Sequence, residues 1–144
     1  MSLKDGLKKM SKSDPSDLSR INLTDDRDEI LNKIKKAKTD PLPLPSDIKG
    51  LNERPEAENL LGIYSSLKNQ SLEKSIIEFE GKNFSEFKNK LSETLIDTVE
   101  PISREIKKLL NEENYLDKIL LEGSDKANKI ASKKIKEIKD LVGF

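Results

Sequence analysis

Apolar residues recur through most of the chain at the spacing of one face of an α-helix. Residues 1–22 have no sustained period and are predicted to form a loop. A helix is predicted to begin near Thr24-Asp25-Asp26, whose side chains can cap its first amides, and to end near Thr39-Asp40. The Pro-rich residues 40–53 are predicted to form a connector, because proline cannot continue a helix.

Two shorter helices and one long helix are predicted to follow the connector. The first begins at Pro55, a residue that the first turn of a helix tolerates, and the second begins at Ser71. From Phe87 to Leu110 the apolar positions keep one face straight through Pro101. We therefore predict one long helix that is kinked at this proline rather than two unrelated helices.

The end of the chain has the same helical character. Gly123 is predicted to break the next segment, and a last helix is predicted from about Asp125 to Val142. The fold class is therefore all-α: a loop followed by a helical bundle of about five or six helices. Four aromatic residues share faces with the apolar stripes and are predicted to be core anchors, not a ligand-binding set: Tyr64, Phe79, Phe84 and Phe87.

Composition narrows the possible functions. The 27 basic and 27 acidic residues balance, so any attraction for an anion has to be local. Without His or Cys the chain has no imidazole base, thiolate or disulfide, which excludes Ser-His-Asp, Cys-His and zinc-hydrolase chemistry. There is no signal-peptide core and no apolar run near the roughly 18 residues that span a bilayer. We expect a soluble, cytoplasmic chain with no membrane partner.

The candidate chemistry lies in the predicted loop, in the run Lys9-Met10-Ser11-Lys12-Ser13. Two lysines three residues apart, interleaved with hydroxyl groups, are suited to a mobile clamp for a polyphosphate. On charge content alone, a loop rich in Lys and Ser is more often simply solvated. The exact order of the five residues changes this interpretation, because it matches the KMSKS signature of the class I aminoacyl-tRNA synthetases.

The resemblance extends beyond the signature. The order of the residues downstream resembles the C-terminal part of the bacterial-type tryptophanyl-tRNA synthetases, and it covers essentially the whole chain. Tyrosyl enzymes of the archaeal and eukaryotic type share a similar loop, but the match after the loop favours the tryptophanyl family. That match includes Ile21-Asn22-Leu23-Thr24-Asp25-Asp26, Asn59-Leu60-Leu61, Ile63-Tyr64-Ser65, Glu80-Gly81-Lys82, Lys126-Ala127 and Ile130-Ala131.

The resemblance implies a role for each residue of the loop. It implies that the loop binds ATP with Mg²⁺, and no protein ligand is assigned to the metal. Lys9 and Lys12 would contact the phosphates and stabilise the transition state of adenylate formation. Met10 and Ser11 would help to seat the nucleotide, and Ser13 would support the loop.

The resemblance also implies a division into domains. Residues 1–23 would be the tail of the catalytic domain, and residues 24–144 a C-terminal helical domain that binds tRNA. The family's Rossmann half, with its tryptophan pocket, would precede Lys9 and is absent from this chain. We therefore expect a fragment that is inactive alone and that belongs to a homodimeric full-length enzyme.

Two further charged clusters have competing interpretations. Lys126, Lys129, Lys133 and Lys136 share one face of the last helix and could contact tRNA phosphates, although a solvated helix face is the commoner outcome. The acidic residues 25–26 and 28–29 could suggest a metal site, but helix capping is favoured because they lead a helix. The alternative to an enzyme fragment is a stand-alone helical module that binds RNA or a protein, with an idle signature loop.

Overall fold

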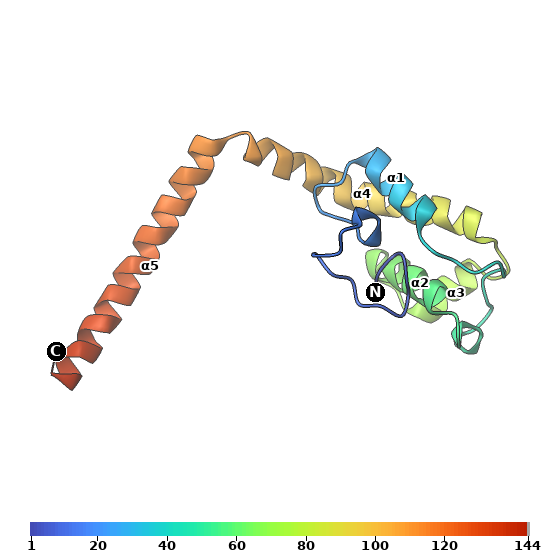
Figure 1. The fold of residues 1–144 in the computed structure, drawn as a ribbon, viewed down its shortest axis with the longest axis horizontal. Coiled ribbons are helices and arrows are strands. Elements are labelled where there is room, and N and C mark those ends of the chain that lie inside the picture. Colours follow the sequence, from blue (N-terminus) through green and yellow to red (C-terminus); the bar gives the residue numbers. More distant parts are fainter. Residues whose placement is uncertain (144) are drawn as a thin grey trace. The chain divides into compact units, whose positions relative to one another are not determined.

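The computed structural model describes residues 1–143, which form helices and connecting loops (Figure 1). No strand occurs in this part of the chain, so the predicted all-α class is confirmed. Two short 3-10 helices are named η1 and η2. In chain order the elements are η1 (Asp17–Ser19), α1 (Arg27–Lys36), η2 (Ile48–Leu51), α2 (Pro55–Leu67), α3 (Leu72–Glu78), α4 (Phe84–Leu110) and α5 (Glu113–Val142).

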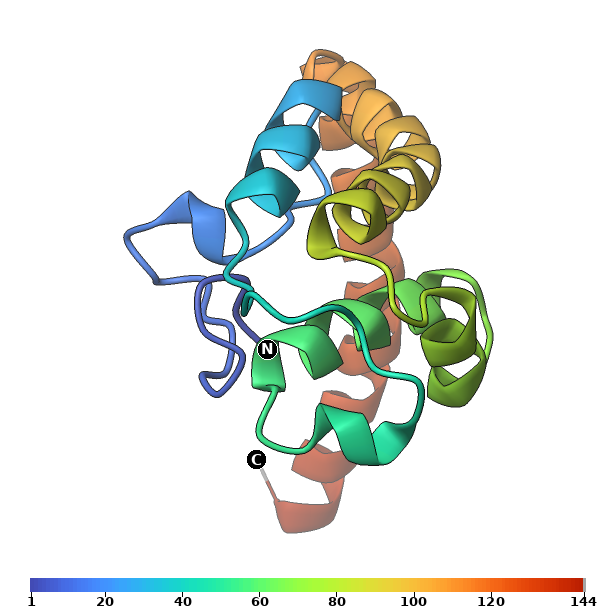
Figure 2. The ribbon, with the colours of Figure 1, turned by 90° about the vertical axis from the view of Figure 1, so that its right-hand side faces the viewer.

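The chain divides into two compact units, Met1–Arg104 and the residues from Glu105 onward. The first unit contains η1, α1, η2, α2, α3 and most of α4 (Figure 2). It also holds the hydrophobic core. The second unit contains the end of α4 and all of α5, and none of the residues of α5 is buried. The predicted domain boundary between residues 23 and 24 stays a prediction.

Helix α1 begins as the sequence predicts but ends earlier. The Asp26 carboxylate accepts from the Glu29 amide, and the Glu29 side chain accepts from the Asp26 amide, which completes a capping box. The helix ends at Lys36, three residues before Thr39. The Lys88 ammonium donates to the Ala37 carbonyl at 2.6 Å, so a side chain from α4 binds the carbonyl end of α1.

The core is built around aromatic rings. Tyr64, Phe79 and Phe87 are buried and meet edge to face, with ring centroids 4.8 to 6.1 Å apart. Phe84 is also buried, so the prediction of four aromatic core anchors is confirmed. The Tyr64 hydroxyl donates to Glu78 at 2.8 Å. Burial and this carboxylate raise the pKa of Tyr64 from its ordinary 10.0 to about 12.

Helix α4 runs antiparallel to α1. The Ser103 hydroxyl donates to the Thr24 carbonyl at the start of α1, whereas Lys88 binds at its end. Pro101 lies inside the helix, so the prediction of one continuous helix is confirmed, and the kink stays a prediction. The first turn is capped by Asn83, whose side-chain oxygen accepts from the Glu86 amide.

The predicted break at Gly123 is wrong. Helix α5 runs without interruption from Glu113 to Val142 and includes the glycine. One glycine in a helix costs only about 1 kcal/mol relative to alanine, which good helix formers on both sides can offset. The predicted stop at Gly143 is confirmed, because this residue caps the helix at a φ of 83°. Among residues 1–143, no helix combines the length and the apolar character that crossing a membrane requires.

Candidate functional site

The five signature residues lie together in one exposed loop near the N-terminus. The hydroxyl groups of Ser11 and Ser13 are 2.9 Å apart, and the Ser13 amide donates to the Ser11 hydroxyl oxygen. The Asp14 amide donates to the Ser11 carbonyl at 3.3 Å. Ser11 and Ser13 thus stabilise the turn itself, and the side chains of Lys9, Met10 and Lys12 extend from it.

The two lysines of the signature have no partner within residues 1–143. In the part of the chain that the structure describes, no hydrogen bond or ion pair involves the ammonium group of Lys9 or Lys12. The carboxylate nearest in sequence to Lys12, Asp14, accepts from the Ser16 amide at 2.8 Å, and the one nearest to Lys9, Asp5, pairs with Lys8 at 3.4 Å. Both ammonium groups are therefore exposed cations that an anionic ligand can reach without displacing an existing ion pair.

The N-terminal side of the loop is attached to the core. Leu3 is buried in the same cluster as the helices, and its amide donates to the Ser19 carbonyl at 2.9 Å. The Leu3 carbonyl in turn accepts from the Lys38 amide at 2.8 Å. Gly6 lies so close to Pro55 that a Cβ atom would be 2.5 Å from its backbone, so only glycine fits here. These contacts fix the chain just before the signature.

The C-terminal side of the loop is attached through a buried lysine. Lys33 of α1 donates to Asp17 at 2.5 Å and to Asp25 at 2.6 Å. The side chains of Lys33 and Asp25 are each 4% exposed. Burial lowers the pKa of Lys33, but the hydrogen bonds to Asp17 and Asp25 outweigh it and leave the pKa raised. The hydrogen bonds from Lys33 and Asn22 lower the pKa of Asp17.

Arg20 links this ion-pair cluster to the signature loop. Its Nη2 atom is 3.0 Å from Asp17, and its Nε atom donates to the Asn22 side chain at 3.2 Å. Its Nη1 atom donates to the carbonyl oxygens of Ser11 at 3.5 Å and Asp14 at 3.3 Å. The guanidinium group therefore bridges the backbone of the loop and the acidic residue that α1 holds.

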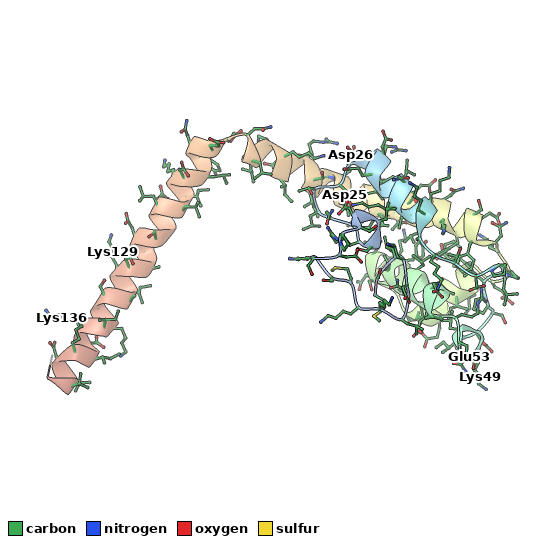
Figure 3. All side chains as sticks on the ribbon, in the orientation of Figure 1. Asp25, Asp26, Lys49, Glu53, Lys129 and Lys136 are labelled. Carbon is green, nitrogen blue, oxygen red and sulfur yellow. The ribbon has the colours of Figure 1, made fainter. Side chains whose placement is uncertain are left out.

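Asp25 and Asp26 lie just before the start of α1 (Figure 3) and have different roles. Asp26 caps the helix as predicted. Asp25 departs from the capping prediction, because it is buried and pairs with Lys33 and Asn22. Within residues 1–143, no group of three or more Asp or Glu side chains could hold a metal ion.

The four lysines of the predicted RNA-binding face all lie on α5 and are exposed. Lys129 and Lys136, which are two helical turns apart, extend from the same side of the helix (Figure 3). Lys134 is different, because it pairs with Glu137 at 2.9 Å. The predicted face thus consists of Lys126, Lys129, Lys133 and Lys136, and no ion pair within residues 1–143 involves them.

Sequence reasoning missed the residues that hold the loop. Lys33 falls between Ile30 and Ile34 on the apolar face of α1, and a lysine at such a position needs a buried partner, which was an available signal. Arg20 and Gly6 carried no comparable signal, because their contacts come from segments that meet only in the fold.

A comparison with known proteins shows the family of this chain. The family profile described as tRNA synthetases class I (W and Y) matches residues 1–100. The chain therefore belongs to this family of class I tRNA synthetases.

The similar relatives within the family are tryptophan–tRNA ligases, which confirms the tryptophanyl resemblance. All 144 residues match the ligase of Agrobacterium fabrum at 53% identity, and that of Rickettsia felis at 52%. The chain spans only 41% and 43% of the length of these two relatives. The crystal structure of tryptophanyl-tRNA synthetase from Mycoplasma pneumoniae matches 75% of this chain and 34% of that one, with 26% identity and a TM-score of 0.61.

Proposed function

We propose that this chain supplies the ATP-binding loop and the helical tRNA-binding domain of a tryptophan–tRNA ligase. The observation that carries the proposal is the pair of ammonium groups of Lys9 and Lys12, which have no partner among residues 1–143. They lie on an exposed signature loop whose two ends are attached to the core. The similarity to tryptophan–tRNA ligases supports tryptophan rather than tyrosine as the amino acid.

Lys9 and Lys12 act on the phosphates of ATP. When the tryptophan carboxylate attacks the α-phosphate, the bond to the β-phosphate breaks and negative charge develops on the departing pyrophosphate. Two flexible ammonium groups can follow this charge, and contacts that strengthen as it develops lower the barrier rather than merely hold ATP. Met10 and Ser11 help to seat the nucleotide, Ser13 supports Ser11, and Mg²⁺ arrives with ATP.

The rest of the reaction depends on parts outside these 144 residues. The tryptophan pocket and the Rossmann half belong to the remainder of the enzyme, which the resemblance places before this stretch. The chain alone is therefore inactive as a ligase. In the complete enzyme it acts in the cytoplasm as part of a homodimer and engages the tRNA for tryptophan.

A chimera tests this function directly. In the Agrobacterium fabrum ligase, this chain replaces the 144 residues to which it is 53% identical. We expect tryptophan-dependent exchange of pyrophosphate into ATP, and Lys12→Ala is expected to lower its kcat by about 10² to 10³, the usual effect of removing one transition-state contact.

The matched control is Lys49→Ala, which removes another exposed lysine, in η2 (Figure 3). It is expected to leave the exchange rate unchanged, and circular dichroism is expected to show the same helix content in both variants. An inactive chimera that is correctly folded would contradict the proposed function. Equal activity of Lys12→Ala and the parent chimera would remove Lys12 from the mechanism.

A further inference from the structure

The contacts of Arg20 join the signature loop to helix α1 through a series of charged groups. The Arg20 side chain is 17% exposed although it lies beside an exposed loop. All three nitrogen atoms of the side chain make contacts: Nη1 with the loop carbonyls and the Ser19 hydroxyl, Nε with Asn22 and Nη2 with Asp17. Asp17 continues the series to Lys33 of α1.

We propose that Arg20 is a positioning residue, which sets the conformation of the signature loop by binding the carbonyl oxygens of Ser11 and Asp14. The proposal deepens the proposed function and rests on it, since a positioned loop matters because Lys9 and Lys12 have to meet the phosphates of ATP. Near-attack geometry has to be held within fractions of an ångström, which an unattached loop does not provide.

The carbonyl groups of Ser11 and Asp14 are well placed for a donor that holds the loop. Ser11 lies between the two lysines, and Asp14 follows the last residue of the signature. A donor that holds both therefore fixes the curvature of the loop and leaves both ammonium groups free. Both hydrogen bonds are long, at 3.5 and 3.3 Å, and are therefore weak. The loop thus has a preferred conformation but can still move as negative charge develops on the departing pyrophosphate.

The geometry requires arginine and not only a positive charge. A guanidinium group is planar and offers five N–H donors in fixed directions, whereas an ammonium group is a single compact centre. Lysine at position 20 could pair with Asp17 or reach the loop, but it could not serve the loop, Asn22 and Asp17 at the same time. Arg20→Lys is therefore expected to rescue little of what Arg20→Gln loses.

Hydrogen–deuterium exchange on the 144-residue chain tests the positioning directly. In Arg20→Gln we expect the amides of Ser13 and Asp14 to exchange about fivefold faster, the effect of losing weak hydrogen bonds to a charged donor. The amides of α2 and α3 are expected to exchange at the parent rate. Arg27→Gln, which changes an exposed arginine at the start of α1, is the matched control and is expected to alter neither set.

Kinetics in the chimera provide the functional measurement. Arg20→Gln is expected to lower the kcat of pyrophosphate exchange about tenfold, because a misplaced loop weakens contacts that form in the transition state. The KM for tryptophan is expected to stay constant, since the tryptophan pocket lies elsewhere. A purely structural role would instead reduce the active fraction and accelerate exchange at every amide.

Amide exchange in the loop and activity of the chimera together decide whether Arg20 positions the loop. Loop amides that exchange at the parent rate in Arg20→Gln would overturn the proposal, as would a uniform acceleration that includes α2 and α3. Full activity of Arg20→Lys would show that a positive charge at position 20 is sufficient, and it would overturn the requirement for the planar guanidinium group. If the parent chimera is inactive while the loop amides respond as expected, the proposed function fails and the positioning contact stands.

Discussion

The signature loop and helix α5 both present exposed lysines without ion-pair partners within residues 1–143, but they differ in how those lysines are held. The loop has five exposed residues between two attachments, one through Leu3 and one through Lys33. Helix α5 has thirty residues and none of them is buried. The two elements therefore share exposed positive charge and differ in their attachment to the core.

This difference fits the two kinds of chemistry. Transition-state stabilisation requires groups at fixed positions, which the buried contacts on both sides of the loop can provide. Attraction of a polyanion depends on the number of charges and on the salt concentration, and it tolerates a mobile or solvated helix face. The loop is thus suited to catalysis, and α5 is suited at most to RNA backbone contacts.

The largest expected effect separates a buried ion pair from an exposed one. Lys33→Met leaves Asp25 buried without its cation, which is expected to destabilise the first unit by about 3–5 kcal/mol. Lys134→Met removes an exposed partner of Glu137 on α5 and is expected to cost less than about 1 kcal/mol. Urea unfolding followed by circular dichroism gives both values.

The contrast between these two variants is the informative quantity. Equal and small losses of stability in the two variants would mean that the Lys33 cluster does not anchor the loop segment. The attachment that distinguishes the signature loop from α5 would then be contradicted. A further variant, Lys33→Met with Asp25→Leu, removes both buried charges and is expected to recover part of the lost stability.

A second, smaller effect concerns alkaline pH. The unfolded chain ionises Tyr64 near pH 10, whereas the folded chain keeps it protonated to about pH 12. The unfolded state therefore loses a proton first, and the stability that Tyr64 contributes is complete below pH 10 and falls as the pH rises toward 12. A shift of this size corresponds to roughly 2–3 kcal/mol.

The measurement compares the parent chain with Tyr64→Phe at pH 8 and at pH 11.5. The phenylalanine variant keeps the ring contacts with Phe79 and Phe87 but cannot ionise. We expect the parent to lose more stability than the variant over this interval. A pH dependence that is identical in the two proteins would show that Tyr64 ionises equally easily in the folded and unfolded chains.

Much of the fold could be predicted because it follows from local rules. The cap at Asp26, the start at Pro55 and the aromatic core all follow from side-chain chemistry and helical spacing. The prediction is wrong at Gly123, because the low helix propensity of one glycine does not outweigh the helix formers around it. An intrinsic preference of about 1 kcal/mol is too small to end a helix by itself.

The candidate site also has one part that could be predicted from the sequence and one part that could not. The signature residues could be found because their order is itself the signal, and the structure places them together in one exposed loop. The residues that attach this loop could not be found from periodicity, because Arg20, Asp17 and Lys33 meet only after α1 has packed beside η1. Contacts of this kind depend on tertiary structure, and a single sequence leaves little trace of them.

The smallest expected effect tests whether α5 takes part in RNA binding at all. Reversal of charge in the double variant Lys129→Glu, Lys133→Glu is expected to weaken binding of the tRNA for tryptophan by about tenfold near 0.1 M salt and to lower the salt slope by about one to two. Fluorescence anisotropy of the labelled tRNA over a series of salt concentrations measures both quantities. The control, Lys49→Glu with Lys74→Glu, makes the same change in net charge on exposed residues of the first unit. If the control weakens binding as much as the α5 variant does, the attraction is diffuse and the lysine face of α5 is not a docking surface. A loss confined to the α5 variant would instead assign RNA contact to the helix that has no buried residues, and leave catalysis to the loop attached to the core.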